Sequence, residues 1–96
     1  MGSIQQTLTA GTDKSGTIAT GGTSQPLAAA NTSRKRLVVQ NVSDTAMTVT
    51  DLLSTATAGE AGCWLIAVGA TWEATTNRAV YIVCATTGKK FTAVEI

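Results

Sequence analysis

Residues 79–85 read AVYIVCA, an apolar, β-branched run that is long enough for one strand and too short for a typical helix. Upstream, residues 63–68 read CWLIAV, a second continuous apolar run, which predicts a strand buried on both faces. Residues 71–75 and Phe91–Ile96 predict two further short strands. Residues 86–89, which follow the run at 79–85 and precede the strand predicted at Phe91–Ile96, contain a glycine and predict a tight hairpin turn.

Before these runs, residues 34–41 form a short apolar segment with β-branched residues and polar ends, and residues 46–50 alternate apolar and polar side chains. In the first, Leu37 and Val39 share one face, and in the second Met47 and Val49 do. The turn-forming residues Asn, Ser and Asp separate the two segments. This pattern predicts a β-hairpin.

Turn signals recur about every 8–12 residues from residue 34 onward, the spacing of an antiparallel sandwich or barrel. The sequence therefore predicts an all-β fold, a single antiparallel β-sandwich with either Ig-like or jelly-roll topology. Residues 1–33 are rich in Gly, Ser, Thr and Ala and predict an extended N-terminal arm or edge strands, with short strands at Gln6–Thr9 and Gly16–Thr20. Residues 34–96 form the predicted core, and the whole chain is one domain.

The composition excludes several classes of function. Only 14% of the 96 residues are charged and the net charge is +1, unlike a nucleic-acid-binding protein. The chain has no histidine, which removes Ser-His-Asp and Cys-His arrangements, and its 2 cysteines cannot form a four-ligand zinc site. We therefore expect no catalytic residues, no cofactor and no metal. The start of the chain lacks the pattern of a signal peptide, and no apolar run would span a membrane, so we expect synthesis in the cytoplasm and no membrane partner.

Two sets of reactive side chains remain. Cys63 and Cys84 lie in apolar runs and are expected to be buried thiols, with a disulfide as the alternative. The 6 carboxylates are scattered along the chain. A small hydrolase using a carboxylate pair that folding brings together, such as Asp51 with Glu73, stays open as an alternative.

Two features are candidates for contact with a partner. Arg34, Lys35 and Arg36 form the only charge cluster. The first interpretation is a solvated strand entry that protects a sheet edge, and the functional alternatives are contact with an acidic protein surface or with phosphate. The aromatic residues Trp64 and Trp72 are expected in the core, on neighbouring strands, and Trp64 has the more apolar strand. Because tryptophan is frequent at interface hot spots, Trp72 is the candidate interface anchor.

Three stretches together resemble a known class of protein. They read GGTSQPLAAANTSRKRLVVQNVSDTAMTVT (21–50), GCWLIAVGATWE (62–73) and AVYIVCATTGKKFTAVE (79–95). Their order of motifs resembles that of small structural proteins of tailed-bacteriophage virions. The matching positions within roughly residues 17–95 are Gln25, Asn31, Arg34, Gln40-Asn41, Gly69, Trp72-Glu73, Thr87-Gly88 and Phe91-Thr92-Ala93.

The resemblance implies a β-sandwich on the capsid exterior, a decoration or cement protein or a head-fibre component. It implies the major capsid protein as partner, and a homo-oligomer with a trimer favoured. The family has no catalytic residues to transfer. Two other assignments stay open: a tail or vertex module that contacts a receptor or glycan, and a cytosolic assembly factor that is absent from purified particles.

Overall fold

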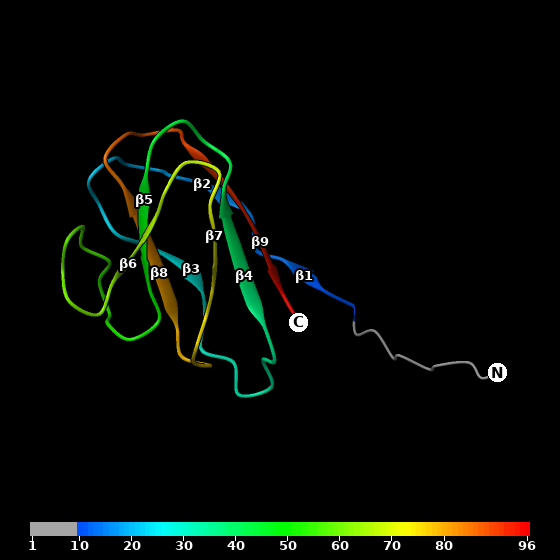
Figure 1. Cartoon of the computed structure of the whole chain (residues 1–96). Coiled ribbons are helices and arrows are strands. Elements are labelled where there is room, and N and C mark those ends of the chain that lie inside the picture. Colours follow the sequence, from blue (N-terminus) through cyan, green and yellow to red (C-terminus); the bar gives the residue numbers. More distant parts are fainter. Residues whose placement is uncertain (1–9) are drawn as a thin grey trace.

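The computed structural model describes residues 10–96, and these form two antiparallel sheets packed face to face (Figure 1). The first sheet has the order β1-β9-β4-β7, with β2 also paired to β9, and the second has the order β3-β8-β5-β6. No helix occurs in this part of the chain, so the predicted all-β sandwich is confirmed. The strands are β1 (Thr12–Asp13), β2 (Gly16–Thr17), β3 (Gln25–Ala28), β4 (Leu37–Asn41), β5 (Met47–Thr50), β6 (Trp64–Ile66), β7 (Thr71–Glu73), β8 (Val80–Cys84) and β9 (Lys90–Glu95).

The strand pairs are nested along the chain, so the polypeptide resembles one long hairpin that has been rolled up. From the chain termini inward to the middle of the sequence, the antiparallel partners include Thr12–Glu95, Gln25–Ile82, Val39–Trp72 and Val49–Trp64. Rolling then adds the pairs β4–β9 and β5–β8. If β1 and β2 are counted as one interrupted strand, this is the eight-stranded jelly roll, which decides between the two predicted topologies.

The predicted hairpin between β4 and β5 is wrong, because the two strands lie in different sheets. The chain crosses from one sheet to the other around Asn41, whose side chain is fully buried. Its Nδ2 donates to the carbonyl oxygens of Thr45 and Ile66 at 2.8 and 3.0 Å, and its Oδ1 accepts from the Ser43 amide at 3.0 Å. These bonds stabilise a crossing loop in place of a two-stranded turn.

The predicted hairpin over residues 86–89 is corrected in the same way. Gly88 has the expected positive φ of 87°, and the chain does turn there. However, β8 belongs to the second sheet and β9 to the first. The turn residues therefore fixed the reversal of direction but not the pairing.

The core lies between the sheets and confirms the predicted inward faces of β4 and β5. Leu37 and Val39 from the first sheet are fully buried, and Met47 and Val49 from the second are at most 1% exposed. The predicted strand at residues 79–85 is confirmed as β8, which lies between β3 and β5. The other buried apolar residues of this cluster are Ile18, Ala28, Ile66, Trp72, Val80, Ile82, Cys84, Phe91 and Ala93.

The segment before residue 34 contributes to both sheets. β1 and β2 pair with β9, and β3 pairs with β8, so each lies at a sheet edge. Ile18 is fully buried in the core, and its backbone bonds to that of Lys89 and Gly88. Residues 12–28 are thus part of the sandwich. The predicted strand at Gln6–Thr9 lies outside the described residues.

The strand predicted to be buried on both faces is instead an edge strand. β6 pairs only with β5 among the described strands, and its outward side chain Leu65 is 71% exposed. Val68, just beyond the strand, is 57% exposed. A continuous apolar run is therefore compatible with an edge strand whose outer face is open, and run length alone did not distinguish the two.

Candidate functional site

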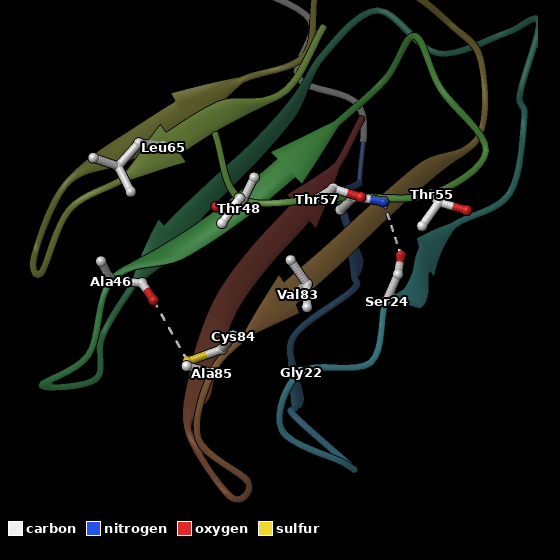
Figure 2. A pocket seen from close by; sticks show the side chains of 12 residues that line it. Gly22, Ser24, Ala46, Thr48, Thr55, Thr57, Leu65, Val83, Cys84 and Ala85 are labelled. Atoms are coloured by element: carbon white, nitrogen blue, oxygen red, sulfur yellow. Dashed lines mark hydrogen bonds between the residues drawn. The ribbon is translucent and has the colours of Figure 1, made fainter. Parts of the chain in front are cut away.

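An uncharged groove of about 370 Å³ lies on the outer face of the second sheet (Figure 2). Its floor is formed by β5, β6 and β8, and one wall by residues 55–58 of the long β5–β6 connection. The lining contains only small, hydroxyl-bearing and aliphatic side chains and one cysteine. These residues are Gly22, Ser24, Ala46, Thr48, Thr55, Ala56, Thr57, Ala58, Leu65, Val83, Cys84 and Ala85.

The floor is a row of three side chains that crosses the sheet from β8 to β6. Val83 pairs in register with Thr48, and Thr48 pairs with Leu65. All three project to the same outer face, since directly paired residues in an antiparallel sheet share a face. Val83 and Thr48 are 8% and 5% exposed, whereas Leu65 at the sheet edge is open to solvent. Only the end of the row at β6 is therefore open to solvent.

The wall of the groove is held at its ends by polar side chains of residues 50 and 51. Thr50 Oγ1 donates to the carbonyl oxygen of Gly62 at 2.8 Å, which ties the start of the connection to its end. The buried Asp51 carboxylate accepts through Oδ2 from the amides of Thr75 and Thr76 at 2.7 and 2.9 Å. These bonds anchor the connection to the segment that follows β7.

A third contact fixes the middle of the wall. The amide of Ala56 donates to Ser24 Oγ at 2.9 Å, and the side chain of Ala56 is buried (Figure 2). Ser24 immediately precedes β3, on the opposite edge of the second sheet from β6. The connection thus passes over the outer face of the sheet, and the groove lies beneath it.

The two cysteines are free thiols, as expected, but they differ in exposure. Cys84 is 2% exposed and lines the groove, with its Sγ 3.5 Å from the carbonyl oxygen of Ala46 (Figure 2). Cys63 is half-buried, so the expectation of two buried thiols holds for Cys84 alone.

A smaller hollow of about 160 Å³ lies at the start of the same connection. Polar groups in its lining come from Asp51, Ser54, Arg78 and Tyr81. Asp51 Oδ1 is buried and has no hydrogen-bond partner among the described residues. Asp51, Arg78 and Tyr81 therefore line one small space, in which Asp51 itself is fully buried.

The structure gives the predicted partner residue Arg34 an internal role. Its side chain is 2% exposed and forms an ion pair with Glu95. It also donates to the carbonyl oxygens of Ala29, Thr76 and Arg78. These bonds occupy the guanidinium donors of Arg34 with partners in the same chain, so its side chain does not face a binding partner.

The other members of the basic cluster lie at the surface. Arg36 Nε and Nη2 donate to the two carboxylate oxygens of Glu73 at 3.1 and 3.2 Å. This hydrogen bonding raises the pKa of Arg36 and lowers that of Glu73. Lys35 is exposed. The cluster thus presents one exposed lysine and one surface ion pair.

Trp72 is also internal. It is 9% exposed and belongs to the core, where its ring centroid lies 5.8 Å from that of Trp64 at a tilt of 43°. The two rings come from opposite sheets, not from neighbouring strands as predicted, and Trp64 is the less buried of the two. Trp72 therefore contributes to packing between the sheets and does not present an interface anchor.

Sequence reasoning missed Leu65, the most exposed large apolar side chain in the described part of the chain. A usable signal was present. Trp64 and Ile66 flank Leu65, and strand periodicity places Leu65 on the face opposite to theirs. The alanines in the lining carry no comparable signal, because Ala46 and Ala85 are far apart in the sequence and line one groove only in the folded chain.

Residues 10–96 contain no cluster of three or more His, Cys, Asp or Glu side chains suited to a metal ion. A search of the same residues found no helix long and apolar enough to cross a membrane. Comparisons with protein-family models, with curated proteins and with solved structures found no match.

Proposed function

We propose that the protein is a non-catalytic structural component of a tailed-bacteriophage virion, which binds the major capsid protein on the head exterior as a decoration protein. The uncharged groove beneath residues 55–58 carries this proposal, since it provides a surface for apolar side chains of another protein. The resemblance of residues 17–95 to small virion proteins supplies the identity of the partner.

The physical properties of the groove suit repeated, non-covalent attachment. Its lining has no charged residue, so binding removes few strongly hydrated groups from water. Each buried Å² of apolar surface contributes about 25 cal/mol. In a symmetric shell the same contact recurs many times, and a copy that contacts several shell subunits gains from multivalency. Modest affinity per contact is then sufficient.

The acidic side chains support a structural role. Five of the 6 carboxylates bond to groups within the chain. In particular, Asp51 holds the residues after β7, whereas Glu73 pairs with Arg36 on the surface. The two candidates for a hydrolytic pair thus have separate structural partners.

The experiment is reconstitution on phage particles that lack the protein, followed by quantitative protein composition of the purified particles. Ala85→Glu places a charge at the groove and is expected to reduce occupancy at least tenfold at limiting protein concentration. Ala30→Glu adds the same charge at an exposed alanine outside the groove and is expected to bind normally. Equal occupancy for both variants would remove the groove from the proposal.

A second candidate function is a tail or vertex module that contacts a host glycan. The smaller hollow favours it, because Arg78 and Tyr81 in its lining offer donors and an aromatic face to a sugar, whereas Asp51 is fully buried and serves the chain itself. Copy number separates the two functions. A copy number that is in proportion to the number of shell subunits supports decoration. A few copies per particle, together with glycan binding that is lost in Tyr81→Ala, supports the tail assignment.

A further inference from the structure

Within residues 10–96 the sandwich has four sheet edges, and three of them carry features that oppose pairing with another chain. β1 and β2 are two-residue strands separated by Lys14 and Ser15. β7 carries Glu73, which pairs with Arg36. β3 contains Pro26 and a register irregularity after it. Short strands, charges, proline and bulges are the usual protections of a sheet edge.

The fourth edge, β6, is also short, at 3 residues, but it has none of the charge, proline or bulge protections. Residues 61–72 contain no charged residue and no proline. The pairing of β6 with β5 is regular over Trp64–Ile66, and no other described strand lies beyond it. Leu65 is 71% exposed at this edge and Val68 is 57% exposed next to it. An apolar, regular and uncovered edge of this kind is a template for strand addition.

We propose that β6 pairs antiparallel with β6 of a second copy of this chain, so that the second sheet becomes continuous across a two-fold axis. Antiparallel pairing makes any strand complementary to itself, and the two-fold interface is the commonest one among homo-oligomers. Pairing centred on residue 65 sets the two Leu65 side chains directly opposite each other on the outer face. The edge carries no like charges that would oppose this contact.

The same register joins the candidate binding surfaces of the two copies. The row formed by Val83, Thr48 and Leu65 lies on the outer face of each sheet. Across the two-fold axis the rows meet at Leu65 and form one strip over both sheets. A dimer would then present two grooves on one side. The dimer itself rests on the β6 edge alone, whatever the grooves bind.

This arrangement differs from the trimer that the sequence resemblance favours. A three-fold ring joins two different surfaces of each subunit, so it cannot pair β6 with itself. The mass of the assembly in solution therefore distinguishes the two arrangements. It also separates this inference from the proposed function, because it is measured on the purified protein without particles.

The test is sedimentation equilibrium of the full chain and of two matched leucine variants. The unchanged protein is expected at twice its 9.8 kDa mass. Leu65→Lys is expected to be monomeric, with the dissociation constant raised at least 100-fold. Leu52→Lys, at an exposed leucine lining the smaller hollow, is expected to remain dimeric. Circular dichroism of both variants checks that the fold is retained.

Amide hydrogen exchange gives a second readout. The amides of residues 64–66 are expected to exchange more slowly as protein concentration rises, and this dependence is expected to disappear in Leu65→Lys. A monomer at the highest soluble concentration, a trimer, or a dimer that survives Leu65→Lys with unchanged exchange at residues 64–66 would each overturn the proposal.

Discussion

Arg34 and Glu95 form a buried ion pair that joins the segment before β4 to the last residue of β9. Nε and Nη2 of Arg34 lie 2.8 and 2.7 Å from Glu95 Oε2, and the two side chains are 2% and 9% exposed. The remaining guanidinium donors bond to three carbonyl oxygens. The guanidinium therefore has a full set of partners, which a buried charge requires.

Arg34→Met is expected to destabilise the protein by about 3–5 kcal/mol, because it leaves the Glu95 carboxylate buried without its main partner. Urea unfolding measures the change. Arg34→Met combined with Glu95→Leu is expected to recover part of the loss, since no buried charge then remains. A single variant within about 1 kcal/mol of the unchanged protein would show that the pair contributes little.

The surface ion pair between Arg36 and Glu73 predicts a pH dependence. The hydrogen bond from Arg36 lowers the pKa of Glu73 below its ordinary value of 4.5. The native state therefore binds fewer protons than the unfolded state in this range, and the contribution to stability is present above about pH 4.5 and lost as the pH falls through the folded pKa.

Glu73→Gln is expected to flatten this part of the acid limb, measured as the urea midpoint between about pH 5 and pH 3. Asp13, bonded to Ser15, and Asp44, bonded to Lys89, also have a lowered pKa and contribute with the same sign. All these groups lie at the surface, so added salt is expected to reduce the effect. An identical pH profile for Glu73→Gln would contradict the assignment.

Ile18 tests whether the segment before residue 34 belongs to the folding unit. Its side chain is fully buried between the sheets. Ile18→Ala is expected to destabilise the protein by about 2–5 kcal/mol, because it removes buried methyl groups and leaves a cavity. Thr17→Ala, at the neighbouring exposed position, is expected to change stability by less than about 0.5 kcal/mol. Similar unfolding midpoints for the two variants would place Ile18 outside the cooperative unit.

Asn41 tests the crossing between the sheets. Asn41→Leu leaves the carbonyl oxygen of Ile66 and the amide of Ser43 without their side-chain partner. The expected loss is about 1–3 kcal/mol for each buried group that is left unpaired, measured by urea unfolding. Asn41→Asp keeps the acceptor for Ser43 but loses the two donated bonds. Asn41→Asp is therefore also expected to be less stable than the unchanged protein, because the carbonyl oxygens of Thr45 and Ile66 lose their donor.

The sequence by itself determined most of the strands after residue 34 and the inward faces of β4 and β5, but not β1 or β3. The two-residue period of a strand, applied to residues 37–41 and 47–50, placed Leu37, Val39, Met47 and Val49 on one face each, and these faces lie in the core. The turn at Gly88 was also readable, because a positive φ favours glycine. These features depend on neighbouring residues, since side-chain periodicity and turn geometry are local properties of the chain.

The groove and the internal position of Arg34 were not predictable in this way. The sequence predicted an exposed charge at Arg34, whereas in the structure its guanidinium bonds to residues 76, 78 and 95. For Trp72 the sequence predicted the core and left an interface anchor as the alternative, and the packing of Trp72 against Trp64 of the opposite sheet confirms the core position. Each position depends on residues distant in the sequence.

Only the tertiary structure decided which strands pair. The turn residues after β4 and β8 reverse the chain equally well in a hairpin and in a crossing between sheets. The choice depends on which backbone donors and acceptors find partners far along the chain, as Thr12 does with Glu95 and Val39 with Trp72. Because backbone hydrogen bonding is the same for every residue type except proline, the sequence of a strand does not name its neighbour, and the nested jelly-roll order follows from the packing of the whole chain.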